Sequence, residues 1–337
     1  MAEQTASGRW LRALLLLAGA ALFAVLAWRI GPRAIAASFG QLGWGLLIVV
    51  VFPFSVITAF DTLGWKYAFR RDRVSFWALA RARVAGEAVN GTTPTGSVGG
   101  EAVKAWLIRD RVPFRESLPS VIVAKTTITI AQGLFLLFGM LVAWPTLPAH
   151  ASWLLKPMGA LLGLETLAVA GFVYAQMAGV LAGSGKMLER IGVSLPAHRG
   201  LPLKRIDRAL FLFYRRQPGR LGLSIGFHFL GWVMSAAETW FILWLLGTPV
   251  SVGTAVVIEA CGTAVRFVTF FIPGHLGALE GGNVAAFMAL GLDPAAGMSA
   301  ILIRRVREAT WIGAGFLVLR APARRPAAAV PVAEPEG

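Results

Sequence analysis

The stretch Pro94-Thr95-Gly96-Ser97-Val98-Gly99-Gly100-Glu101 returns in outline far downstream as Pro273-Gly274-His275-Leu276-Gly277-Ala278-Leu279-Glu280. In each copy the proline precedes the glutamate by seven residues, and a cation follows the glutamate by twenty-four, Lys125 in the first copy and Arg304 in the second. Both copies lie in strongly apolar surroundings. Apolar segments that glycine and proline break at matching positions of two halves indicate a transporter-type binding site where two repeats meet.

The composition is that of a membrane protein. Of the 337 residues 56% are hydrophobic and only 15% are charged, with a mean hydropathy of +0.67, whereas a soluble domain has about 25% charged residues. Apolar runs of about twenty residues, the length that crosses a bilayer, recur along the chain. The sequence therefore predicts an all-α, polytopic integral membrane protein with no room for a large soluble domain.

The apolar runs predict one transmembrane domain over residues 1–320. Its first half covers about 42–144 and its second half about 221–319, and the Ala/Pro-rich tail 321–337 is predicted to be disordered. Residues 183–219 are expected to form amphipathic helices on the cytoplasmic surface of the membrane. Segments 75–110 and 251–291 are each predicted to be a pair of moderately apolar helices broken by the Pro/Gly motif. Six full spans are predicted, the first of them an uncleaved span rather than a signal peptide: Leu11–Trp28, Leu42–Thr62, Pro119–Trp144, Trp153–Ala182, Leu221–Gly247 and Ala295–Leu319.

The loop charges predict the orientation. Lysine and arginine gather in the loops between residues 70 and 115 and between 186 and 220, whereas the loops 145–152 and 248–250 carry neither. The positive-inside rule then places the basic loops and both termini in the cytoplasm of a bacterial inner membrane. Segment 75–110 would dip in from the cytoplasm and segment 251–291 from outside, as two re-entrant hairpins of an inverted repeat. The alternative is that these segments are ordinary short spans or surface helices.

The net charge of +15 fits attraction to anionic lipid headgroups rather than to nucleic acid. The four histidines lack metal-ligand spacing, Cys261 is the only cysteine, and no Gly-Lys-Ser/Thr follows either glycine-rich motif. We therefore predict no metal, no cofactor, no nucleotide site and no catalytic residue.

Charged residues inside apolar segments are the candidate site residues, because ionisable groups in a span are costly and usually face a partner or a cavity. The cations are Lys104, Lys125, Arg266, Arg304, Arg305 and Arg307, and the acids are Glu101, Glu165, Glu238, Glu259, Glu280 and Glu308. Two interpretations stay open. The groups form structural ion pairs, with Glu101 and Glu280 favoured at helix N-termini, or they line a polar cavity for a phosphate-bearing ligand.

The pattern Asn90…Pro94-Thr95-Gly96-Ser97-Val98-Gly99-Gly100-Glu101-Ala102-Val103-Lys104, with Ala124-Lys125 downstream, resembles the Asn…Pro-Gly-x-x-Gly-Glu-x-x-Arg…Glu-Arg motif of the flippase-like membrane domain of lysylphosphatidylglycerol synthases. Pro273–Glu280, with Arg304 downstream, resembles that family's second motif. The run Ala124–Thr127 is most similar to the branch associated with hopanoid biosynthesis. Ala124 stands where the family has Glu, and Lys104 and Lys125 stand where it has Arg, so the bidentate guanidinium fork is absent there.

The resemblance implies translocation of a polar-headed or anionic lipid between leaflets, without ATP hydrolysis. The soluble aminoacyl-transferase domain of the synthases has no counterpart here, so it does not imply an enzyme. A membrane-embedded enzyme acting on lipid headgroups, or a scaffold that binds lipid-biosynthesis enzymes, is the alternative. The predicted binding residues are Asn90, Pro94, Gly96, Gly99, Glu101, Lys104, Lys125, Pro273, Gly274, Gly277, Glu280 and Arg304.

Overall fold

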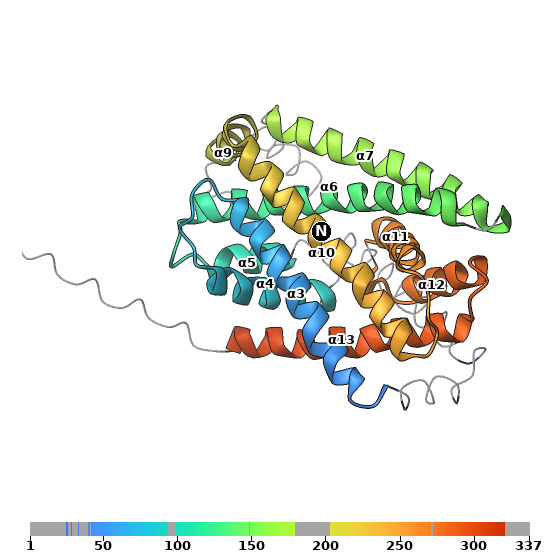
Figure 1. Ribbon diagram of the computed structural model, residues 1–337. Coiled ribbons are helices and arrows are strands. Elements are labelled where there is room, and N and C mark those ends of the chain that lie inside the picture. The colour runs from blue at the N-terminus through green and yellow to red at the C-terminus, as the bar shows by residue number, and fades with distance from the viewer. Residues whose placement is uncertain are drawn as a thin grey trace, which may run out of the picture.

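The computed structural model describes residues 42–93, 99–147, 149–178, 203–270 and 272–320, together with the isolated positions 25, 28, 33 and 40. Apart from Val25 and Trp28, the predicted first span lies outside the described residues, and so does the predicted disordered tail. The described part is all-helical and contains ten α-helices (Figure 1). In chain order they are α3 (Gly45–Tyr67), α4 (Phe76–Thr92), α5 (Gly99–Leu107), α6 (Phe114–Thr146), α7 (Leu155–Met177), α9 (Leu203–Arg216), α10 (Pro218–Leu245), α11 (Val252–Val268), α12 (Ala278–Ala289) and α13 (Pro294–Arg320).

Three helical segments in the described residues are both long and apolar enough to cross a membrane: α3, α6, and the segment Ala149–Met177, in which a 3-10 turn (Ala149–Leu154) leads into α7. Helices α10 and α13, with 28 and 27 residues, are as long, but they are not among these three segments. At 1.5 Å per residue each is about 40 Å long, more than the ~30 Å hydrocarbon layer. Each of these two helices buries charged side chains in the bundle, Glu238 on α10 and Arg304 and Arg307 on α13.

Two sets of four helices follow the same plan. Helices α4 and α11 both have 17 residues, and each begins after an extended serine, Ser75 or Ser251. Helices α5 and α12 begin at Gly99 and Ala278, which are as far apart in sequence as Glu101 and Glu280. Each short helix is followed by a long one, α6 or α13, and each set begins with a long one, α3 or α10. Each copy of the sequence motif is therefore preceded and followed by the same order of long and short helices.

Helices of the two sets also pack on one another. Helices α3 and α10 pack along their whole length, and they run antiparallel, because Gly45 meets Leu245 at one end and Tyr67 stacks on Phe227 at the other. Helix α4 packs on α13, and its counterpart α11 packs on α6. One helix of each hairpin therefore packs on the last long helix of the other set.

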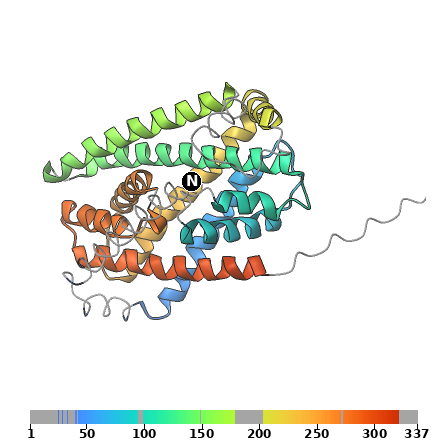
Figure 2. The ribbon, with the colours of Figure 1, turned by 180° about the vertical axis from the view of Figure 1, so that it is seen from behind.

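The two helical hairpins lie toward opposite ends of the long helices. The α4–α5 hairpin lies at the end of α6 that is near α9, and the α11–α12 hairpin lies toward the other end (Figure 1), as the view from behind also shows (Figure 2). The amphipathic helix α9, within the region predicted to lie at the membrane surface, buries Ile206, Leu210 and Phe213 against the bundle. Its basic residues, Lys204, Arg205, Arg208, Arg215 and Arg216, are exposed.

Candidate functional site

The first hairpin closes through glycines and one asparagine. A Cβ at Gly100 would collide with the carbonyl oxygen of Gly86 and with the side chain of Asn90, so α4 and α5 approach this closely only without one. Asn90 Oδ1 accepts a hydrogen bond from Gly100 N at 2.8 Å, and Asn90 Nδ2 donates to Glu101 Oε1 at 3.4 Å. Asn90 therefore fixes the start of α5 against the end of α4.

A chain of ion pairs, which we call the first ionic cluster, lies beside this contact and consists of Asp61, Arg83, Glu87, Glu101 and Lys104. Lys104 Nζ lies 2.7 Å from Glu87 Oε1 and 2.9 Å from Glu101 Oε1. Arg83 Nη2 lies 2.6 Å from Asp61 Oδ2 on α3. Lys104 is buried, and a buried ammonium is tolerated because carboxylates neutralise it. The cluster joins α3 to both helices of the hairpin.

The second hairpin turns with a different backbone. Gly274 and Gly277 both have positive φ, 59° and 78°, a conformation that glycine adopts without steric cost. The turn leads into α12, where Glu280 Oε2 accepts a hydrogen bond from Gly277 N at 2.7 Å. Glu280 is fully buried, so its charge requires a partner.

Arg305 on α13 is that partner. Its Nε lies 2.8 Å from Glu280 Oε1, and its Nη1 donates to Gly274 O at 2.7 Å and to Glu308 Oε2 at 2.9 Å. One guanidinium therefore holds the turn, the start of α12 and a second carboxylate at once, as its planar fork of donors permits.

A third set of charges, the core ionic cluster, consists of Glu238, Glu259, Arg266, Arg304 and Arg307. Arg304 Nη1 donates to Glu259 Oε2 at 2.7 Å, and Arg266 Nη1 donates to Glu259 Oε1 at 3.1 Å. Arg307 donates to Glu238. These contacts join α10, α11 and α13, and they neutralise carboxylates that are themselves buried.

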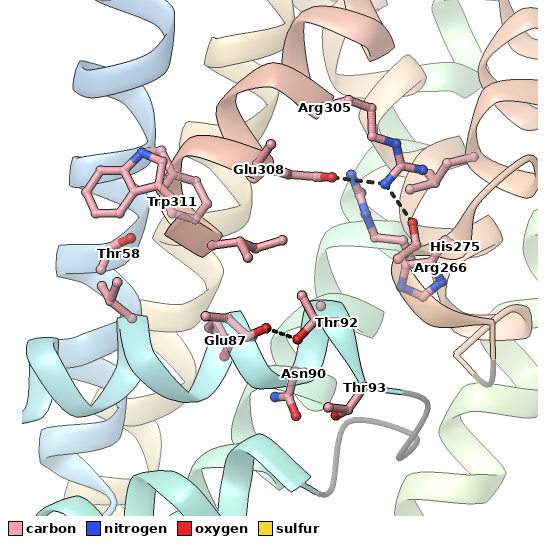
Figure 3. A pocket seen from close by; sticks show the side chains of 18 of the residues that line it. Thr58, Glu87, Asn90, Thr92, Thr93, Arg266, His275, Arg305, Glu308 and Trp311 are labelled. Atoms are coloured by element: carbon pink, nitrogen blue, oxygen red, sulfur yellow. Dashed lines mark hydrogen bonds and ion pairs between the residues drawn. The ribbon is translucent and has the colours of Figure 1, made fainter. Parts of the chain in front are cut away.

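A cavity of about 680 Å³ lies between the two hairpins. Figure 3 shows Glu87, Asn90 and Thr92 of α4 on one side and Arg305, Glu308 and Trp311 of α13 on the other. The charged lining is balanced, with three carboxylates and three guanidiniums: Asp61, Glu87, Glu308, Arg83, Arg266 and Arg305. The remaining wall is largely apolar and includes Phe54, Phe270, Trp311 and Ile312. Such a cavity suits an amphiphile whose polar part meets the charges and whose apolar part meets the rings.

The predicted binding residues other than Arg304, which belongs to the core ionic cluster, divide into four groups. Asn90 and Gly274 line the cavity, whereas Glu101, Lys104 and Lys125 line a small adjoining hollow of about 30 Å³ together with Arg83 and Glu87. Gly99 and Gly277 lie at the starts of α5 and α12, Pro273 begins the second turn, and Glu280 is buried beneath it. Pro94 and Gly96 lie outside the described residues.

The structure corrects the expected equivalence of Lys125 and Arg304. Neither residue is in the lining of the large cavity. Lys125 is exposed on α6, and Arg304 faces Glu259, not Glu280. The next residue, Arg305, occupies the cavity position, because one step along a helix turns the side chain by about 100°.

The sequence interpretation missed Asp61, Arg83 and Glu87 as members of the site. Arg83 was counted among the loop cations, but it lies inside α4 with a side chain that is only 11% exposed. The available signal was the spacing of Arg83 and Glu87, four residues apart on one helical face. Within the described part of the chain, no three His, Cys, Asp or Glu side chains come together as metal ligands would.

Membrane-length apolar helices and an interior cavity with paired charges define a multi-pass integral membrane protein. Residues 10–314 match the model of the lysylphosphatidylglycerol synthase TM region, and the chain belongs to that family. A UPF0104 membrane protein of Methanothermobacter thermautotrophicus is 22% identical over 87% of this chain and 90% of its own. A UPF0104 membrane protein of Pyrococcus horikoshii is 22% identical over 91% of this chain and 96% of its own. No solved structure matches.

Proposed function

We propose that the protein moves a polar-headed lipid between the leaflets of its membrane, with the headgroup passing through the cavity between the two hairpins. The observation that carries this proposal is the lining of that cavity, in which three carboxylates and three guanidiniums share one space with aromatic walls. Charged side chains within a membrane are costly unless a partner compensates for lost water, and a polar headgroup can be that partner. The apolar wall of the cavity suits the part of the lipid next to the headgroup.

Arg266 is the cation best placed to meet a headgroup. It lines the cavity, its side chain is 20% exposed, and its one ion pair in the described residues is with Glu259. Arg305 lines the same space but already holds Glu280, Glu308 and the turn. A headgroup phosphate would therefore bind first to Arg266, since that contact leaves the packing of the second turn intact.

The inverted repeat belongs to this proposal. Helix α5, with 9 residues, and α12, with 12, are about 14 Å and 18 Å long, too short to cross a ~30 Å hydrocarbon layer. The antiparallel packing of α3 with its counterpart α10 is what a two-fold axis in the membrane plane requires. We therefore infer that both hairpins are re-entrant and dip in from opposite faces, with the basic loops and termini in the cytoplasm of a bacterial inner membrane.

The passenger is proposed to be an anionic or otherwise polar-headed lipid, and a hopanoid is one candidate because of the resemblance at Ala124–Thr127. No nucleotide is required by this proposal. Mass spectrometry of lipids that co-purify with the protein would identify the passenger. A lipid whose mass changes on incubation with the protein would instead indicate an enzyme, and binding of lipid-biosynthesis enzymes without lipid movement would indicate a scaffold.

A matched pair of tryptophan variants tests the path. Thr58 lines the cavity, whereas Thr166 is exposed on the outer surface of α7. In liposomes that contain the protein and acyl-labelled fluorescent phosphatidylglycerol, dithionite quenching should reveal inner-leaflet lipid that becomes accessible. Thr58→Trp should slow this movement by roughly tenfold. The indole would occupy cavity space that the headgroup needs, and forcing extra atoms into a packed space costs about 1–3 kcal/mol. Thr166→Trp should leave the rate unchanged, and equal rates for both variants would contradict the proposed path.

A further inference from the structure

One buried carboxyl group differs from all the others discussed above. Glu165 lies on α7 and is only 2% exposed, and neither of its carboxyl oxygens has a hydrogen-bond partner within the described part of the chain. By contrast, the equally buried Glu238, Glu259 and Glu280 are each paired with an arginine. The site and the proposed path leave Glu165 unexplained.

The packing of α7 on α6 leaves space for this side chain. The opposing residue on α6 is Gly133, where an added Cβ would lie 3.6 Å from Glu165 Cδ and 3.7 Å from Oε2. Glu165 stands ten residues after the start of α7 and twelve before its end, about 15 Å or more from either end. Because Ala149–Met177 is a membrane-length apolar segment, this position is near the middle of the bilayer.

Other titratable groups on neighbouring elements lie away from Glu165. Lys125 on α6 is eight residues from Gly133, about 12 Å along the helix. Cys261 of α11 contacts Met158 of α7, seven residues or about 10 Å from Glu165. The remaining groups on the packed elements are Arg115, Glu116, His150, Lys156, Tyr174, Lys204, Arg205, Asp207, Arg208, Tyr214, Arg215, Arg216, Glu259 and Arg266. No ion pair joins any of these described residues to Glu165.

An ionised carboxylate at such a position would cost many kcal/mol, so the group carries its proton instead. We propose that Glu165 is a proton-binding site within the membrane that couples the lipid movement to protons. The carboxyl is protonated in this packed conformation and releases its proton to water when the α6–α7 interface opens. This inference rests on the proposed function.

A physical connection runs from Glu165 to the cavity. Gln132, next to Gly133 on α6, donates a hydrogen bond to Thr263 O on α11 at 3.2 Å. Thr263 stands four residues after Glu259 and three before Arg266, the cavity cation. A shift of α6 against α7 would therefore move the segment of α11 that bears Arg266.

Chemical labelling tests the proton site without any transport assay. Dicyclohexylcarbodiimide reacts with protonated carboxyl groups in apolar surroundings, so mass spectrometry of the full-length protein in lipid nanodiscs should find it on Glu165. The label should decrease as the pH rises, because the ionised form does not react, and it should be lost in Glu165→Gln but kept in Glu116→Gln. Glu116 is a matched control on α6 whose side chain is 41% exposed. Absence of label at Glu165 would overturn the proposal.

The coupling is tested in the fluorescent-lipid liposomes with an imposed pH gradient. The natural sequence should respond to the gradient, and Glu165→Gln, which mimics the protonated form, should move lipid at a rate that no longer responds. Glu165→Leu serves the same purpose if the glutamine variant fails to fold. A gradient response that survives in the variant would overturn the coupling. Absence of any lipid movement by the natural sequence would refute the proposed function and its coupling, and the labelling would still decide whether Glu165 is a proton site.

Discussion

The two hairpins carry a glutamate at equivalent positions of the sequence motif but neutralise it differently. Glu101 is paired with Lys104 of its own short helix and receives a hydrogen bond from Asn90 of the other helix of the same hairpin. Glu280 is paired with Arg305, which belongs to the long helix α13. The first hairpin therefore carries its own counter-charge, whereas the second depends on a neighbouring helix. The turn of the second hairpin is therefore held by an arginine of α13, a helix outside that hairpin.

Removal of the cation should give the largest difference in stability between the two hairpins. Arg305→Met leaves Glu280 fully buried without a cation, and breaking a buried pair in this way costs about 3–5 kcal/mol. Lys104→Met should cost less, because the side chains of Glu101 and Glu87 are 16% and 43% exposed, and Asn90 still donates to Glu101. Thermal unfolding of the purified proteins in detergent measures the difference.

Two further variants test whether the uncompensated charge of Glu280 causes the loss of stability. Adding Glu280→Gln to Arg305→Met should restore much of the lost stability, since the uncompensated charge is then gone. Arg320→Met, at the exposed end of α13, is the control and should behave like the natural sequence. Equal destabilisation by Arg305→Met and Lys104→Met would mean that the second hairpin is no more dependent on its neighbour than the first.

A smaller difference is expected from glycine substitutions inside the hairpins. Gly100→Ala places a Cβ against the backbone carbonyl of Gly86, which cannot rotate away, so it should cost about 1–3 kcal/mol. Gly282→Ala meets Cγ2 of Val265 at 2.6 Å, a side chain that can shift, and should cost less. Gly163→Ala on α7 meets nothing within 4 Å and is the control. The order of the three unfolding temperatures checks the prediction, and a more stable Gly100→Ala than Gly282→Ala would contradict it.

The Pro/Gly motif made the positions of the short helices predictable. Glycine and proline end one helix and allow the next to begin, so the shared spacing correctly indicated a helix pair in each half, with α5 and α12 beginning near Gly99 and Ala278. The apolar runs likewise indicated α3, α6 and α7. These features depend on local chemistry and on length, which a sequence displays directly.

The partners of the charges were not predictable in the same way. Arg304, Arg305 and Arg307 lie within one turn of α13, yet they face Glu259, Glu280 and Glu238. A step of one residue turns the side chain by about 100°, so spacing alone could not decide which arginine meets the cavity. Asp61 was missed because its partner Arg83 is on another helix, a contact that only the tertiary packing creates.

The membrane face from which each hairpin enters is the central feature of the proposed inverted repeat and can be measured. Ser75 and Ser251 are both exposed and occupy the same position before α4 and α11, so Ser75→Cys and Ser251→Cys form a matched pair in a Cys261→Ser background. If the hairpins enter from opposite faces, a membrane-impermeant maleimide should label Ser251→Cys from outside intact cells and Ser75→Cys only after the membrane is opened. The background protein without cysteine should stay unlabelled throughout. Labelling of both positions from the same side would contradict hairpins that enter from opposite faces and share one central cavity.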